Sequence, residues 1–207
     1  MALLLLAVAI GLAGGYLRAR WAGRQLTAPS LSATWLVVVA FLPQWLAFFW
    51  PASRDRLPDG WIAIGLVASQ VLLLLFVWIN REQPGFWLLG FGLAMNLAVI
   101  ALNGGWMPIS PETLHRLYPE RAPETWVVGQ RLGTSKDLIM ATADTRLAWL
   151  SDRFVVPAWF PYRAAFSLGD ILIAVGTVGL MWAAGGNEAN QPTLRRTHTY
   201  VITNVGE

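Results

Sequence analysis

The chain has 207 residues, of which 56% are hydrophobic and only 13% are charged, a balance typical of an integral membrane protein and not of a water-soluble enzyme. It contains no cysteine, which excludes disulfides, iron–sulfur clusters, thiolate zinc sites and cysteine catalysis. The net charge is +3, but the basic residues are scattered and do not form the aromatic-interleaved basic face that binds nucleic acid. We therefore expect no nucleic-acid partner.

Five apolar stretches follow one another along the chain. They cover residues 2–17, 33–51, 61–80, 86–102 and 166–185. A helix that crosses a bilayer needs about 20 apolar residues and rarely fewer than about 17, so the first stretch is marginal and the other four qualify. The sequence therefore predicts an all-α integral membrane protein with about five transmembrane helices.

The first stretch resembles a secretory signal, but its positive charges come after the apolar run and not before it, so we interpret it as an uncleaved helix. Cytoplasmic loops are enriched in Lys and Arg. An N-terminus outside and a C-terminus in the cytoplasm place most of the basic loop residues inside: Arg18, Arg20, Arg24, Arg81, Arg195 and Arg196. The predicted location is the bacterial cytoplasmic (inner) membrane, and tryptophans near the expected helix ends fit aromatic belts.

Small residues at a spacing of four mark expected close approaches between helices in lipid. Three such ridges are Ala7 with Gly11 and Gly15, Gly90 with Ala94 and Ala98, and Gly179 with Ala183. Ridges of this kind either pair within one protein or dock a helix of another protein, and both interpretations stay open.

Three amides, Gln44, Gln70 and Asn96, lie near the middle of their predicted spans. Because an unpaired amide is costly in hydrocarbon, we expect a mutual hydrogen-bond network between helices. The functional alternative is a polar patch that binds a quinone, a carotenoid or a lipid head group, which makes these three the candidate cofactor-binding residues. No cofactor is predicted, although contact with a pigment, quinone or lipid through Trp-rich surfaces is left open.

Residues 103–165 form one long extracytoplasmic connection. Asn103-Gly104-Gly105 is expected to end the fourth helix, and Ser110-Pro111-Glu112 to start a short helix that ends at Pro119. The run from Thr134 to Asp137 reads as a capping box, which predicts a second helix through about Ala143.

This connection shows no catalytic or metal-binding pattern. It contains one histidine, and it lacks HExxH, GxSxG and a phosphate-binding glycine loop. Asp144, Arg146 and Asp152 could organise a polar site, but paired charges in an irregular loop more often hold a fold together. We therefore expect no catalytic residue, no metal site and no enzyme activity.

Asp170 is the one carboxylate within the five stretches. Ser167-Leu168-Gly169-Asp170 matches a capping box at the start of the fifth helix, where the carboxylate accepts backbone N–H bonds. This accounts for Asp170 better than a role in a proton relay.

The chain resembles a family of uncharacterised bacterial membrane proteins. The likeness rests on Asn103-Gly104-Gly105-Trp106-Met107-Pro108, then Asp144-Thr145-Arg146-Leu147, then Phe166-Ser167-Leu168-Gly169-Asp170. It covers roughly residues 1–185 and implies the same architecture, with no activity to carry over.

The predicted organisation is a four-span membrane region (1–102), the extracytoplasmic segment (103–165), a fifth transmembrane helix (166–185) and a cytoplasmic tail (186–207). Alternation in the tail suggests a short strand, with disorder equally open. We expect a non-enzymatic accessory or scaffold subunit of a larger respiratory or photosynthetic membrane complex. Its partners would be lipid and other membrane subunits, reached through the small-residue helix faces and segment 103–165. The alternative is a small transporter or lipid-active enzyme that uses the amides or the outer segment.

Overall fold

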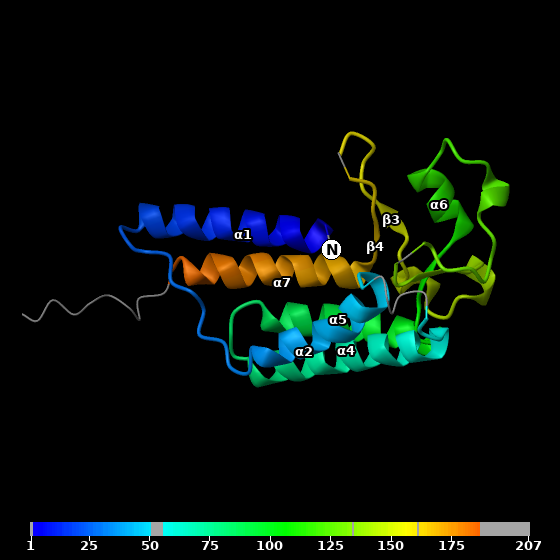
Figure 1. Cartoon of the computed structure of the whole chain (residues 1–207). Coiled ribbons are helices and arrows are strands. Elements are labelled where there is room, and N and C mark those ends of the chain that lie inside the picture. The colour runs from blue at the N-terminus through cyan, green and yellow to red at the C-terminus, as the bar shows by residue number, and fades with distance from the viewer. Residues whose placement is uncertain (1, 51–55, 134, 161, 187–207) are drawn as a thin grey trace, which may run out of the picture.

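The computed structural model describes residues 2–50, 56–133, 135–160 and 162–186. The chain is mostly helical, and each predicted apolar stretch contains one helix (Figure 1). These helices are α1 (Ala2–Trp21), α2 (Trp35–Phe48), α4 (Asp59–Ile79), α5 (Phe86–Leu102) and α7 (Leu168–Ala184). By length and composition α1 and α4 can cross a membrane, whereas α2, α5 and α7 are shorter apolar helices. The expected C-terminal strand lies outside the described residues.

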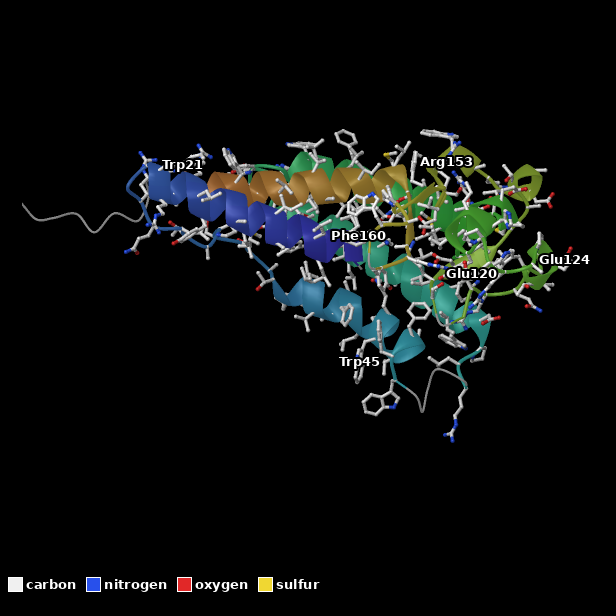
Figure 2. The ribbon with its side chains drawn as sticks, turned by 90° about the horizontal axis from the view of Figure 1, so that it is seen from above. Trp21, Trp45, Glu120, Glu124, Arg153 and Phe160 are labelled. Carbon is white, nitrogen blue, oxygen red and sulfur yellow. The ribbon has the colours of Figure 1, made fainter. Side chains whose placement is uncertain are left out.

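The five long helices form an open row in which each packs mainly on its neighbours, in the order α1, α7, α5, α4, α2. The two end helices, α1 and α2, each have one principal neighbour, and Figure 2 shows α2 at one edge of the molecule. Many large apolar side chains of these helices are therefore exposed. Such a layer leaves most of its side chains in contact with whatever surrounds it.

Glycines allow α7 to approach both of its neighbours. On α1, Gly11 and Gly15 lie against Met181 of α7, so this predicted ridge pairs within the chain. The contact between α5 and α7 is made by two antiparallel glycine pairs, Gly85 with Gly176 and Gly92 with Gly169.

The predicted ridge of Gly90, Ala94 and Ala98 does not make this contact. Gly90 faces Val77 of α4, and Ala94 is exposed. The glycines that do meet are seven residues apart on each helix, which is two turns and therefore one face. Small residues at a spacing of four therefore do not mark this contact.

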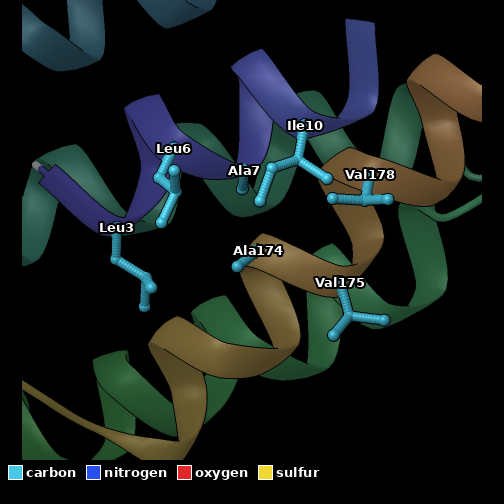
Figure 3. Close-up of a pocket in the computed structure, with 7 residues that line it drawn as sticks. All are labelled: Leu3, Leu6, Ala7, Ile10, Ala174, Val175 and Val178. Carbon is cyan, nitrogen blue, oxygen red and sulfur yellow. The ribbon is translucent and has the colours of Figure 1, made fainter. Parts of the chain in front are cut away.

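An apolar groove of about 220 Å³ follows the α1–α7 contact (Figure 3). It is lined by Leu3, Leu6, Ala7, Ile10, Ala174, Val175 and Val178. The residues that line it carry no polar side chain.

Residues 103–165, called the cap below, cover one end of the row (Figure 1). The cap contains α6 (Pro111–Leu117), the parallel pair β1 (Met107–Ile109) and β2 (Asp137–Ile139), and β3 (Phe154–Val155). β3 pairs antiparallel with β4 (Ala165–Phe166), and short 3-10 turns lie at Pro123–Thr125, Thr142–Asp144 and Ala148–Leu150. The end of the row beneath the cap is called the cap end, and the opposite end the tail end.

Two predicted features of the cap are confirmed. α5 ends at Leu102, and Gly104 and Gly105 follow with φ of 73° and 88°. α6 begins at Pro111 because the Ser110 Oγ accepts a hydrogen bond from the Thr113 N–H at 3.2 Å. Local capping chemistry therefore fixes both boundaries.

The predicted helix through Ala143 is wrong. Ser135 does form a local bond, but its Oγ accepts from the Asp137 N–H at 3.1 Å and closes a turn. The backbone that follows pairs with β1 and with residues 130–132, for example through Ile139 N–H to the Gln130 carbonyl at 2.9 Å. Strand pairing has outweighed the local helix-start pattern; Thr134 itself lies outside the described residues.

The α5–α7 contact predicts a sharp difference between two glycines of α7. A Cβ at position 176 would lie 2.7 Å from the Gly85 carbonyl oxygen and 2.8 Å from the Leu89 nitrogen, whereas one at position 179 would lie 3.7 Å from its nearest neighbour. Gly176→Ala should therefore destabilise the protein by about 1–3 kcal/mol, measured as a lower melting temperature in detergent. Gly179→Ala is the matched control and should be neutral or slightly stabilising; equal effects of the two changes would contradict this packing.

Candidate functional site between the helices and the cap

A polar cluster lies where the cap meets α5 and α7. It contains Asn96 of α5, Ser167 and Asp170 at the start of α7, and Lys136 and Asp152 of the cap. These side chains come from four separate parts of the sequence. The two groups are coupled electrostatically, since the charge of Asp170 acts on both Lys136 and Asp152.

The start of α7 is the first half of the cluster. The predicted capping box is confirmed: the Ser167 Oγ accepts from the Asp170 N–H at 3.1 Å, and Asp170 Oδ2 accepts from the Ser167 N–H at 3.0 Å. Asn96 completes it, since its Nδ2 donates to Asp170 Oδ1 at 3.0 Å and its Oδ1 accepts from the Ser167 Oγ at 3.0 Å. The capping box at the start of α7 therefore also forms the polar link between α5 and α7.

The three candidate amides do not form the expected mutual network. Gln44 Nε2 donates to the Ser69 Oγ at 2.6 Å, which links α2 to α4. Asn96 links α5 to α7, and Gln70 Oε1 is buried without a hydrogen-bond partner among the described residues. The open row explains the difference, because it places these amides in different helix pairs. Sequence reasoning missed Ser69 and Ser167 as their partners.

Lys136 and Asp152 form the second half of the cluster. Lys136 Nζ lies 3.0 Å from Asp152 Oδ2 and 3.5 Å from Asp137 Oδ1. The exposed fraction of the side chain is 3% for Asp152, 15% for Asp137 and 35% for Lys136. The ion pair therefore sits at the boundary of the interior, with the carboxylate inside and the lysine reaching it from the rim.

Backbone pairing holds these two residues in place. Asp152 forms a parallel bridge with Ile109 at the end of β1, and the Lys136 carbonyl accepts from the Met107 N–H at 3.1 Å. β1 therefore has Lys136 on one side and Asp152 on the other. Of the three cap residues considered from the sequence, Asp152 belongs to the cluster, whereas Asp144 and Arg146 are exposed.

Asn103 connects α5 to the cap. Its Oδ1 accepts from the Arg146 N–H at 2.9 Å, and its Nδ2 donates to the carbonyls of Arg146 at 2.9 Å and Val99 at 2.8 Å. The next residue, Leu147, has a φ of 54°, which is rare outside glycine. The two hydrogen bonds between Asn103 and Arg146 hold this strained turn. They connect the motif that begins at Asn103 to the motif that ends at Leu147.

Comparison with known proteins gives a family without an assigned activity. The profile described as "Family of unknown function (DUF5317)" matches residues 29–182, about three quarters of the chain. The chain belongs to this family. It is also 33% identical over 122 residues to an uncharacterised protein of Thermotoga maritima, a match covering 56% of this chain and 61% of the relative. The chain thus spans about three fifths of that relative's length. No solved structure matches this chain.

The residues of the cluster all lie within the part of the chain that matches DUF5317. Its carboxylates outnumber its cation: Asp137 and Asp152 contact Lys136, and the charge of Asp170 acts on it as well. Burial raises the pKa of Asp152 to about 8. The neighbouring carboxylates also raise this pKa, whereas Lys136 lowers it. Burial alone would lower the pKa of Lys136, but the carboxylates around it, Asp152 first, raise it above its ordinary value.

This arrangement favours a bound proton. Asp152 Oδ1 is buried and has no hydrogen-bond partner among the described residues, which is costly for an ionised carboxylate. Protonated Asp152 removes one negative charge from the interior and still accepts the Lys136 hydrogen bond. Within the described ranges no group of three or more His, Cys, Asp or Glu side chains could hold a metal ion.

The raised pKa of Asp152 predicts that the protein loses stability as the pH rises towards 8. An Asp carboxyl in the unfolded chain titrates near 3.9, so between about pH 4 and pH 8 the folded protein binds more protons than the unfolded protein. The contribution of Asp152 to stability therefore falls as pH rises through that window. We expect the melting temperature at pH 8.5 to lie roughly 3 °C or more below that at pH 6, about the effect of 1 kcal/mol in a chain of this size.

The variant Asp152→Asn should remove most of this pH dependence. The matched control His115→Gln should keep it, because His115 is exposed and outside the cluster. A wild-type melting temperature that is flat or rises between pH 6 and pH 8.5 would contradict a proton on Asp152.

Proposed function

We propose that this chain is an integral protein of the bacterial cytoplasmic membrane that crosses the bilayer with α1, α2, α4, α5 and α7. The N-terminus would lie outside, and the C-terminus in the cytoplasm. In support, successive long helices run in alternating directions, α5 and α7 lying antiparallel, and Arg18, Arg20, Arg24 and Arg81 belong to the tail end. The three shorter helices reach about 21–26 Å at 1.5 Å per residue, which a bilayer that thins around them accommodates.

Single-cysteine variants test this topology directly, because the native chain has no cysteine. In intact cells a membrane-impermeant maleimide should label Ala143→Cys in the cap, and should label Ala28→Cys only after the membrane is opened. The unmodified chain is the control for background labelling. The reverse pattern would overturn the orientation, and labelling of both sites in intact cells would exclude a membrane between them.

We further propose that the protein is a non-enzymatic accessory or scaffold subunit of a larger membrane complex, respiratory or photosynthetic. The supporting observation is the apolar surface of the cap. Val127, Val128 and Trp149 are 48%, 53% and 54% exposed. Lipid accounts for exposed apolar side chains along the helices but not for those on a segment outside the bilayer. A contiguous apolar patch in water is typical of a protein–protein contact, and we propose that the adjacent Val127 and Val128 belong to one.

The helix ridges contribute less to this proposal than the cap does. Gly11 and Gly15 pack on α7, and Gly90 packs on α4, so these small residues serve contacts within the chain. The partner subunit is therefore expected to contact residues 103–165.

The alternative of a small transporter or lipid-active enzyme has weaker support. Gln44 and Asn96 are held by bonds to neighbouring helices. The apolar groove between α1 and α7 is lined by none of the three amides. The amides therefore serve best as links between helices.

A charge placed on the cap should weaken partner binding and leave the fold intact. Val128→Glu should reduce the co-purification of partner subunits from native membranes in mild detergent at least several-fold, with an unchanged melting temperature. Ala143→Glu, also on an exposed turn of the cap, should leave the recovered complex unchanged. Recovery of the wild-type protein as a monomer without partners would contradict its proposed role as a subunit of a larger complex.

A further inference from the structure

The tail end of α1 carries a concentration of positive charge. Arg18 and Arg20 lie in its last turn, and Arg24 follows it. Residues 1–54 contain no Asp or Glu, so nothing nearby in the sequence offsets these charges. The sequence explains them by membrane orientation; the structure shows that they are also arranged around a hollow.

Two of the arginines anchor α1 to the end of α7. Arg18 Nη1 donates to the Trp182 carbonyl at 3.0 Å, and its guanidinium carbon lies 5.4 Å from the centre of the Trp182 ring. Arg24 Nη1 donates to the Gly186 carbonyl at 2.9 Å. These bonds satisfy carbonyls at a helix C-terminus, where positive charge is favourable.

Arg20 has a different position. It is exposed, and its Nη1 lies 3.4 Å from the Tyr16 hydroxyl. A guanidinium carries five N–H donors in a planar fork that matches the oxygens of a phosphate. Arg20 therefore presents donors to the surroundings of α1.

A hollow of about 370 Å³ lies between α1 and the segment that follows it. It is lined by Tyr16, Ala19, Arg20, Arg24, Gln25 and Leu26. Its lining combines two arginines, an amide and a phenol with two apolar side chains. Such a combination suits a molecule with an anionic group next to hydrocarbon.

The position along α1 supports the same kind of ligand. Trp21, 81% exposed, marks this end of α1 in Figure 2, and Tyr16 is 53% exposed; both residue types favour the head-group level of a bilayer. Leu5 and Leu12 are also exposed and lie on the helix face of Tyr16, at a spacing of seven and then four residues. A polar site at the head-group level thus continues into an apolar strip at acyl-chain depth.

We propose that this hollow binds the phosphate head group of an anionic phospholipid in the cytoplasmic leaflet. Arg20 and Arg24 hold the phosphate, the Tyr16 hydroxyl and the Gln25 amide contact the rest of the head group, and an acyl chain follows Leu12 and Leu5. The site rests on the proposed membrane topology and adds a specific ligand to it. A free phosphate would use the arginines but gain nothing from Leu26, Ala19 or the apolar strip.

Native mass spectrometry of the purified full chain in detergent tests the site. Phosphatidylglycerol and phosphatidylcholine with identical acyl chains are added at equal concentration, and the retained lipids are counted. Wild-type protein should retain phosphatidylglycerol at least tenfold more than phosphatidylcholine. Arg20→Gln should lower this preference several-fold, and Arg20→Gln with Arg24→Gln should abolish it.

The control variant is Arg81→Gln. Arg81 belongs to the same end of the molecule, but its guanidinium stacks 4.3 Å from the Trp78 ring and it does not line the hollow, so this change should keep the preference. Because Arg24 also anchors Gly186, melting temperatures are measured for all variants. If the double variant unfolds, the lipid preference of the single Arg20→Gln variant is the deciding result.

Two further arms separate the outcomes. Millimolar glycerol 3-phosphate should not displace the lipid; displacement at that concentration would indicate a soluble phosphate ligand and overturn the lipid assignment. Equal retention of the two lipids by the wild type, or an equal loss in Arg81→Gln and Arg20→Gln, would also overturn it. If the lipid test fails while the cysteine labelling confirms the topology, the lipid site is rejected and the proposed topology stands.

Discussion

The close contact between α5 and α7 is the constraint on which the rest of the structure depends. Gly85 and Gly92 meet Gly176 and Gly169 with no side chain between the two backbones. This proximity lets Asn96 reach the N-terminus of α7 and form hydrogen bonds with both Ser167 and Asp170. α1 then attaches to the free side of α7, and α4 to the free side of α5. A wider separation of α5 and α7 would break the polar link and divide the row in two.

The same contact positions the cap. α5 leads directly into Asn103, which binds the backbone of Arg146, and β4 leads directly into Ser167. The cap is therefore tied at one end to α5 and at the other to α7, which pack closely on each other. Arg131 adds a third tie, since its Nη1 lies 3.3 Å from Asp59 Oδ1 at the start of α4. The Lys136–Asp152 pair, with its carboxylate buried, lies within a framework held from three sides.

Features that depend on a few neighbouring residues could be predicted from the sequence. The capping box at Ser167, the Ser110 cap and the glycine stop after Asn103 use side chains within about four residues of the backbone groups they bind. The Lys136–Asp152 pair could not be found in this way, because sixteen residues separate its members and β1, which lies between them, comes from a third place. The helix expected from Thr134 failed for the same reason: its local signal was real, but pairing with β1 and residues 130–132 satisfied the backbone instead. The glycine pairs lay between these cases, since a spacing of seven was visible in the sequence but its partner face was not.

The two ends of the helical row carry opposite chemistry. At the cap end, two carboxylates contact one lysine, the charge of a third acts on it, and burial favours a proton on Asp152. At the tail end, arginines bind the terminal carbonyls of α7 and surround a hollow that no carboxylate lines. Between the ends, the described helices offer mainly apolar side chains and a few amides that bind neighbouring helices. A surrounding bilayer would interact with the middle of the row without regard to sequence, whereas recognition requires placed charges and exposed groups. The binding sites proposed for this chain therefore lie at the two ends, and the row of helices sets the distance between them.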